Sequence, residues 1–166
     1  QLVQKCQFEQ GVRLGEDMLF NYQYLENATK VSVIDYSGYI YNINSNSATH
    51  TFKEGDFEGQ LNLREKGIEF YREVLGGEGI PKVIEQNYVG NILGIIISLV
   101  TTLSIKESYF YLKKYLNNEF FVSKLKAYFP INMKFKMLKI VCFKKCYFGI
   151  ILLGKINKLR MRFNTN

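Results

Sequence analysis

The sequence is poor in the residues that build disulfide frameworks and metal centres. It contains only three cysteines, Cys6, Cys142 and Cys146, and a single histidine, His50. An odd number of cysteines argues against a disulfide framework and is typical of proteins from a reducing compartment. Cys142 and Cys146 would share one helical face, but two thiols without a nearby histidine or third cysteine make a poor zinc site. We therefore expect these cysteines to be buried free thiols.

Acidic residues are missing from residues 131–166, which carry seven lysines and two arginines. The chain has a net charge of +7, so the preceding residues have two more acidic than basic side chains. A local excess of one sign predicts an anionic partner, either membrane lipid or nucleic acid.

The bulk composition excludes a disordered protein, because 47% of the residues are hydrophobic and 15% are aromatic. A chain of 166 residues is long enough to enclose one sizeable core. It begins with Gln1 rather than methionine, and its opening residues resemble the middle of a domain. We therefore expect it to be a piece of a longer protein.

The first third of the chain predicts a helix followed by two β-rich runs. Met18, Tyr22 and Leu25 fall on one helical face, while Val31 and Val33 alternate with polar residues as in a strand. The expected elements are a helix at 14–27, a strand at 30–35, a turn at 36–38, a β-rich run at 39–43 and a polar loop at 44–51.

The remainder predicts helices. Ser104 and Glu107 have the spacing of a capping box, and Pro81 suits the first position of a helix. The expected helices cover residues 61–75, 81–102, 104–116 and 119–128, with a mixed apolar and basic tail at 132–163. The uncharged run 87–105 approaches the length of a membrane span, but its glycines and polar residues favour a buried core helix.

Three short runs in the first third carry a resemblance to a known family. Residues 15–21 read Gly-Glu-Asp-Met-Leu-Phe-Asn, residues 39–41 read Tyr-Ile-Tyr, and residues 46–50 read Asn-Ser-Ala-Thr-His. With them, the stretch 8–52 resembles the second half of the catalytic domain of family 2 glycosyltransferases, which build bacterial surface polysaccharides. The resemblance implies an α/β fold, namely the C-terminal part of a GT-A (Rossmann-like) domain at 1–55. A mainly helical extension at 56–130 and a basic amphipathic tail at 131–166 would follow.

The resemblance also implies catalytic residues. Asp17 would be the general base that deprotonates the acceptor hydroxyl during inverting sugar transfer, and Glu16 would support it or contact the acceptor. The alternative is that both carboxylates only stabilise the start of a helix.

A metal site and a donor contact are implied further along. His50 would help to coordinate Mn²⁺ or Mg²⁺ on the donor diphosphate, and Ser47 and Thr49 would donate hydrogen bonds to diphosphate oxygens. The alternatives are a solvated histidine and turn-capping hydroxyls.

One element of the family is missing, because no Asp-x-Asp occurs in the chain. Asp56-Phe57-Glu58 has similar spacing, but it lies downstream of the base and is predicted to occupy a glycine-flanked loop. The nucleotide-sugar donor would therefore lack its main site, and we expect this chain to be inactive alone.

The basic tail admits several interpretations. An interfacial amphipathic helix on an anionic membrane would suit an enzyme with a glycan or lipid-linked acceptor at the inner face of the cell membrane. The alternative is a core-packing helix with a solvated basic face. Nucleic-acid binding is disfavoured by the aliphatic run 150–153. A non-catalytic helical module that binds the membrane surface is the alternative function for the whole chain.

Overall fold

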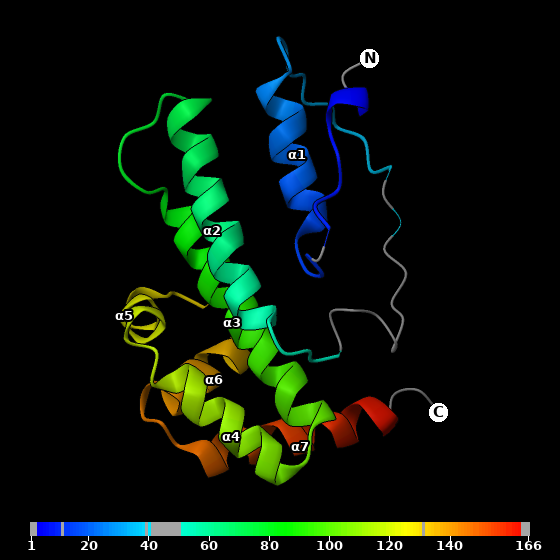
Figure 1. The fold of residues 1–166 in the computed structure, drawn as a ribbon. Coiled ribbons are helices and arrows are strands. Elements are labelled where there is room, and N and C mark those ends of the chain that lie inside the picture. Colours follow the sequence, from blue (N-terminus) through cyan, green and yellow to red (C-terminus); the bar gives the residue numbers. More distant parts are fainter. Residues whose placement is uncertain (1–2, 11, 39, 41–50, 131, 164–166) are drawn as a thin grey trace.

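The structure is a computed structural model that describes residues 3–10, 12–38, 40, 51–130 and 132–163, the side chains of Val3 and of 159–163 excepted. Every regular element in these ranges is a helix (Figure 1). The elements are the 3-10 helix η1 (Val3–Lys5) and the α-helices α1 (Glu16–Glu26), α2 (Asp56–Glu73), α3 (Lys82–Thr102), α4 (Ile105–Leu116), α5 (Glu119–Ala127), α6 (Met133–Phe143) and α7 (Tyr147–Phe163).

The expected α/β fold is therefore wrong for the part of the chain that the structure describes. Residues 30–35 form no strand, and Val31 and Val33 are 65% and 97% exposed. A strand needs a neighbouring strand to satisfy its backbone and bury its apolar face, and none is present in the described ranges. The second β-rich run lies mostly outside those ranges, and its Ile40 is in no element and 84% exposed.

Helix α3 is the centre of the core. It contacts α2, α4, α5, α6 and α7, and its Ile92, Leu93, Ile96 and Leu99 are fully buried. By length and composition it is the one helix in the described ranges that could cross a membrane, yet half of its most apolar stretch is buried in this structure. A buried core helix, which the glycines and polar residues of 87–105 favour, can have the same apolar composition as a membrane span.

The local signals for helix ends are confirmed at α4. The Ser104 hydroxyl accepts a hydrogen bond from the Glu107 backbone at 3.3 Å, and the Glu107 carboxylate accepts one from the Ser104 backbone at 3.0 Å, which completes the capping box. For α2, in contrast, the predicted start is wrong, since this helix begins at Asp56 rather than at residue 61. Gly55 precedes it with a φ of 94°, a left-handed conformation that favours glycine.

The basic tail forms two helices joined at Lys145, which has a φ of 50°. Leu138 and Cys142 of α6 enter the core together with Ile150 of α7. Burial raises the pKa of the Cys142 thiol to about 12, whereas Cys146 is exposed, so the expectation that both thiols are buried is wrong.

Lysines of the tail bind the C-terminal ends of other helices. Lys155 donates to the carbonyl of Leu103 at the end of α3 (3.0 Å), and Lys139 donates to the carbonyl of Tyr128 at the end of α5 (2.6 Å). Lys145 donates to the side chain of Asn117, which ends α4 (2.8 Å). Helix C-termini present unpaired carbonyls with a partial negative charge. Three of the lysines in the basic tail therefore have hydrogen-bond partners inside the protein.

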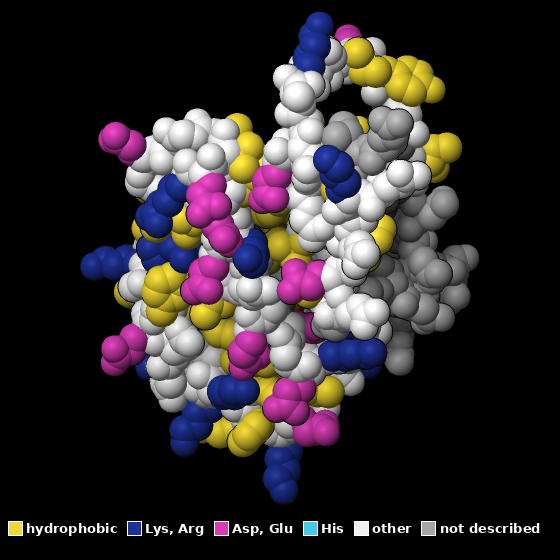
Figure 2. Space-filling model, turned by 45° about the horizontal axis from the view of Figure 1, so that its top comes forward, with side chains coloured by type: hydrophobic (Ala, Val, Ile, Leu, Met, Phe, Trp, Pro, Cys, Tyr) yellow, Lys and Arg dark blue, Asp and Glu magenta, His cyan; other side chains and the backbone are white. Residues whose placement is uncertain are grey.

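The face of the molecule that Figure 2 shows carries both signs of charge. Figure 2 shows acidic and basic side chains interspersed with apolar ones on the face that includes the top of Figure 1. This pattern agrees with the nearly balanced charge of the residues before 131.

Candidate functional site

A polar cavity of about 370 Å³ lies where the segment before α1 meets α2 and α3. Phe135 of α6 closes part of its wall. Buried polar side chains line it, among them Gln60 and Ser98, which are 3% and 7% exposed. Gly94 of α3 also lines it, and outside its chain neighbours and the adjacent backbone of α3 no atom lies within 4 Å of the place where a Cβ would stand, so this glycine leaves room in the cavity.

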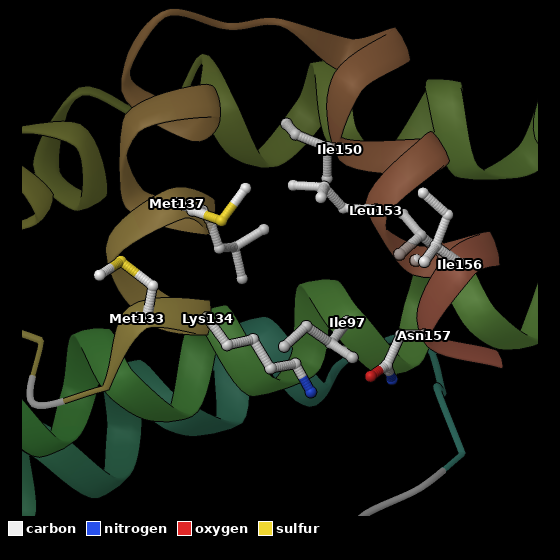
Figure 3. Close-up of a pocket in the computed structure, with 11 residues that line it drawn as sticks. Ile97, Met133, Lys134, Met137, Ile150, Leu153, Ile156 and Asn157 are labelled. Carbon is white, nitrogen blue, oxygen red and sulfur yellow. The ribbon is translucent and has the colours of Figure 1, made fainter. Parts of the chain in front are cut away.

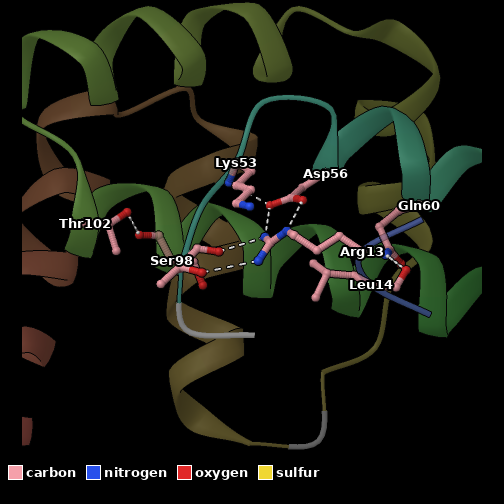
Figure 4. Close-up of polar contacts among 8 residues, drawn as sticks. Arg13, Leu14, Lys53, Asp56, Gln60, Ser98 and Thr102 are labelled. Carbon is pink, nitrogen blue, oxygen red and sulfur yellow. Dashed lines mark hydrogen bonds and ion pairs between the residues drawn. The ribbon is translucent and has the colours of Figure 1, made fainter. Parts of the chain in front are cut away.

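An ion pair between Arg13 and Asp56 holds one side of this cavity (Figure 4). Arg13 Nε lies 2.9 Å from Asp56 Oδ1, and the guanidinium also donates to the Thr51 carbonyl at 2.8 Å. The backbone N–H of Lys53 donates to the same carboxylate at 2.8 Å. The buried carboxylate is thus paired and hydrogen-bonded, as burial of a charge requires. It connects the segment before α1 to the start of α2.

Amide groups form the second polar wall. Asn91 of α3 donates to the side-chain oxygen of Gln60 at 2.8 Å, and Gln60 donates to the carbonyl of Leu14 at 3.3 Å. These two hydrogen bonds hold the Gln60 side chain between α3 and the residue before Gly15. The hydroxyls of Ser98 and Thr51 add further polar groups to the lining, and Thr51 Oγ1 accepts a hydrogen bond from Arg13 Nη1 at 3.2 Å. Leu14, Ile95 and Phe135 make the rest of the lining apolar.

The structure places the expected catalytic pair in the first turn of α1. Asp17 is exposed and Glu16 is half-buried, and neither lines the polar cavity, although Gly15 does. The Asp17 carboxylate accepts a hydrogen bond from the backbone of Met18 at 2.8 Å. Acidic side chains in a first turn stabilise a helix, so this position is compatible with either role that the sequence predicts.

The backbone conformation and packing at position 15 explain why a glycine stands there. Its φ of 95° lies in the left-handed region, and an added Cβ would lie 2.5 Å from Leu63 of α2. The glycine of the run 15–21 is thus required where the chain turns into α1 beneath α2.

The other expected site residues, Ser47, Thr49 and His50, lie outside the described residues, so their predicted roles stay predictions. Within the described ranges no group of three or more histidine, cysteine, aspartate or glutamate side chains could hold a metal ion.

Sequence reasoning missed the polar cavity and its ion pair. Asp56 was assigned to a glycine-flanked loop, but it is the first residue of α2 and its partner lies 43 positions away. An acidic residue directly after Gly55 was the available signal, because glycine and aspartate are both common at helix starts. Nothing local indicated Arg13.

No protein-family model, curated protein or solved structure matches the chain.

Proposed function

We propose that this chain supplies the acceptor side of an inverting glycosyltransferase, with Asp17 as the general base and Glu16 as its neighbour. The sequence of residues 15–21 carries the proposal, and the exposed carboxylate in the first turn of α1 supports it. A base must reach the hydroxyl of an incoming acceptor, which an exposed carboxylate can do. The proposal makes no use of a GT-A fold for these residues.

The chemistry would be a single displacement. Asp17 takes the proton of the acceptor hydroxyl while the oxygen of that hydroxyl bonds to the anomeric carbon of the donor. The bond from the anomeric carbon to the nucleotide diphosphate breaks, and its electron pair leaves with the diphosphate oxygen. Mn²⁺ or Mg²⁺, held in part by His50, would offset the charge of the departing diphosphate. The polar cavity next to Gly15 would hold hydroxyls of a glycan or the sugar of a lipid-linked acceptor, and another polypeptide segment would bind the donor.

The test uses the longest natural polypeptide that contains this segment, with nucleotide sugars as donors and membrane extract as acceptor. Asp17→Asn should lower kcat by about 10²–10⁴-fold with little change in the donor KM, because it removes the base and leaves the donor site. Asp35→Asn, which changes another exposed carboxylate, is the matched control. A kcat within a few-fold of wild type in Asp17→Asn would refute the base, and unchanged metal dependence in His50→Ala would refute the ligand.

A second candidate function is docking to an anionic membrane surface through α6. Met133, Met137 and Ile140 follow one another at helical spacing and are 69%, 49% and 54% exposed, while Leu138 and Cys142 on the opposite side are buried. Lysines flank this apolar stripe, and no acidic residue occurs in the tail. Interfacial helices combine an apolar face with basic flanks in this way.

Vesicle co-sedimentation tests the docking. The chain should bind vesicles of phosphatidylglycerol and phosphatidylcholine better than vesicles of phosphatidylcholine alone, and Ile140→Ser should weaken the binding. Ile105→Ser, at an exposed position in the first turn of α4, is the control. Equal binding to both vesicle types, or equal effects of the two substitutions, would argue against docking by α6.

A further inference from the structure

A second cavity, separate from the polar one, lies between α3, α6 and α7. Its volume is about 480 Å³, within the roughly 300–1,000 Å³ range of ligand pockets in proteins. Aliphatic and thioether side chains form nearly all of its wall, among them Ile97, Met137, Leu138, Ile150 and Leu153. Such a wall excludes sugars, nucleotides and metal ions, because it offers few groups that could replace their hydration.

The polar groups of this cavity gather on one side. Figure 3 shows Lys134 of α6 and Asn157 of α7 extending toward one another near Ile97, while Met137 and Ile150 lie on the other side. Lys134 is the only ionisable side chain in the lining and is exposed, and it makes no ion pair within the described ranges. The cavity therefore combines an apolar interior with one positive charge at its edge.

The mouth of the cavity adjoins the exposed stripe on α6. Met133 and Met137 both line the cavity and are both largely exposed to solvent. Methionine side chains are unbranched and adapt to irregular apolar ligands. A ligand could thus enter past them with little rearrangement of the helices.

We propose that this cavity binds one acyl chain of an anionic membrane lipid, with the chain among Met137, Ile150 and Leu153 and the head group beside Lys134. A single acyl chain is apolar along its length and charged at one end, which matches the distribution of groups in the cavity. The absence of acidic residues from the tail favours an anionic over a zwitterionic head group. This inference goes beyond membrane docking, because it concerns a saturable internal site rather than adsorption to a surface.

The experiment titrates the full chain with 1-myristoyl-lysophosphatidylglycerol, kept below its micelle concentration, and follows binding by isothermal titration calorimetry. We expect one lipid per chain and weaker binding of the phosphatidylcholine analogue. Myristate distinguishes a free fatty acid from a phospholipid as the source, and should bind less well than the phosphatidylglycerol analogue. Binding of myristate alone, a stoichiometry well above one, or no preference for the anionic lipid would overturn the proposal.

Two pairs of variants locate the site. Leu153→Trp fills the cavity and should weaken binding by about tenfold or more. Leu152→Trp, at the preceding and exposed position, should leave binding unchanged. Lys134→Glu should weaken binding of the anionic lipid. Lys136 lies two residues further along α6 and does not line the cavity, so Lys136→Glu should have a much smaller effect. Equal effects within either pair would overturn the assignment of the site.

The proposal remains testable if Leu153→Trp does not fold. Circular dichroism and urea unfolding would reveal the failure, and Met137→Trp at the open edge of the cavity then replaces it. Failure of lipid binding is distinguishable from failure of membrane docking, because docking is tested at Ile140, which does not line the cavity.

Discussion

At the scale of single residues, the core contains two buried oxygens without hydrogen-bond partners in the described part of the chain, Tyr115 Oη and Ser108 Oγ. The Tyr115 ring is stacked on Phe57 with centroids 4.3 Å apart, and only 1% of the residue is exposed. Burial raises the pKa of this phenol, so it is neutral at all ordinary pH values. The ring contributes packing, while its hydroxyl has lost water without a replacement partner.

Tyr115→Phe should therefore raise the free energy of unfolding by about 1 kcal/mol, because it removes the unpaired hydroxyl and keeps the stacked ring. Urea unfolding followed by circular dichroism would measure the change. Tyr109→Phe is the control, since Tyr109 is 48% exposed and its hydroxyl can contact water. A loss of stability in Tyr115→Phe would show that the hydroxyl has a partner, such as an internal water molecule.

At the scale of the elements, the lysines of the tail act as caps for the helices packed beside them. Lys139 donates to two carbonyls at the end of α5, those of Lys126 at 3.0 Å and Tyr128 at 2.6 Å. Lys139→Met should cost about 1 kcal/mol of stability by removing these charged hydrogen bonds at the negative end of a helix. Lys136→Met removes an exposed lysine of the same helix and should cost much less. Equal unfolding midpoints for the two variants in urea would contradict the capping role.

Three helices are also joined by one carboxylate. Glu85 of α3 accepts hydrogen bonds from Arg64 of α2 and from Lys124 of α5, at 3.0 and 2.9 Å. The Arg64 guanidinium also lies over the ring of Phe120, 4.9 Å from its centroid. Hydrogen bonding by Arg64, followed by that of Lys124, lowers the pKa of Glu85 below its ordinary value of 4.5.

This lowered pKa gives the fold a defined dependence on pH. A carboxylate whose pKa is lower in the folded than in the unfolded state stabilises the fold above the unfolded value, and this stability is lost as the pH falls through the folded value. Glu85→Gln should cost on the order of 2 kcal/mol at pH 7 and less at pH 3, which is below the ordinary value of 4.5. Glu69→Gln, which changes an exposed pair with Lys66, should cost less than about 1 kcal/mol at either pH. A cost for Glu85→Gln that did not shrink between pH 7 and pH 3 would contradict the linkage.

These elements also show which features a sequence can predict. The capping box of α4 lies within four consecutive residues, so its sequence pattern was sufficient. The start of α2 was missed because the buried charge of Asp56 depends on Arg13, far away in the chain. The alternation in residues 30–35 predicted a strand, but a strand also needs a partner, which local alternation cannot supply.

At the scale of the whole molecule, the two cavities share the same pair of helices. Ile97 of α3 and Lys134 of α6 line the apolar cavity, while the residues directly after them, Ser98 and Phe135, line the polar one. Helices α3 and α6 thus contribute to a lining with polar side chains and to an apolar one. A lipid-linked sugar also combines a polar with an apolar part, which would connect the proposed acceptor to the proposed lipid. Neither cavity could be predicted from the sequence, because each arises from helices that are distant in the chain. The catalytic roles of Glu16 and Asp17 stay predictions.

The helical fold itself can be tested by one pair of matched substitutions. Val33 is 97% exposed and in no element, whereas Val89 is 1% exposed on α3. Val33→Ala should therefore change the free energy of unfolding by less than about 0.5 kcal/mol, and Val89→Ala should lower it by about 2 kcal/mol through lost burial and packing. Urea unfolding of both variants makes the comparison. If Val33→Ala costs as much as Val89→Ala, the Val33 side chain is packed against the rest of the protein, which would contradict its exposed position.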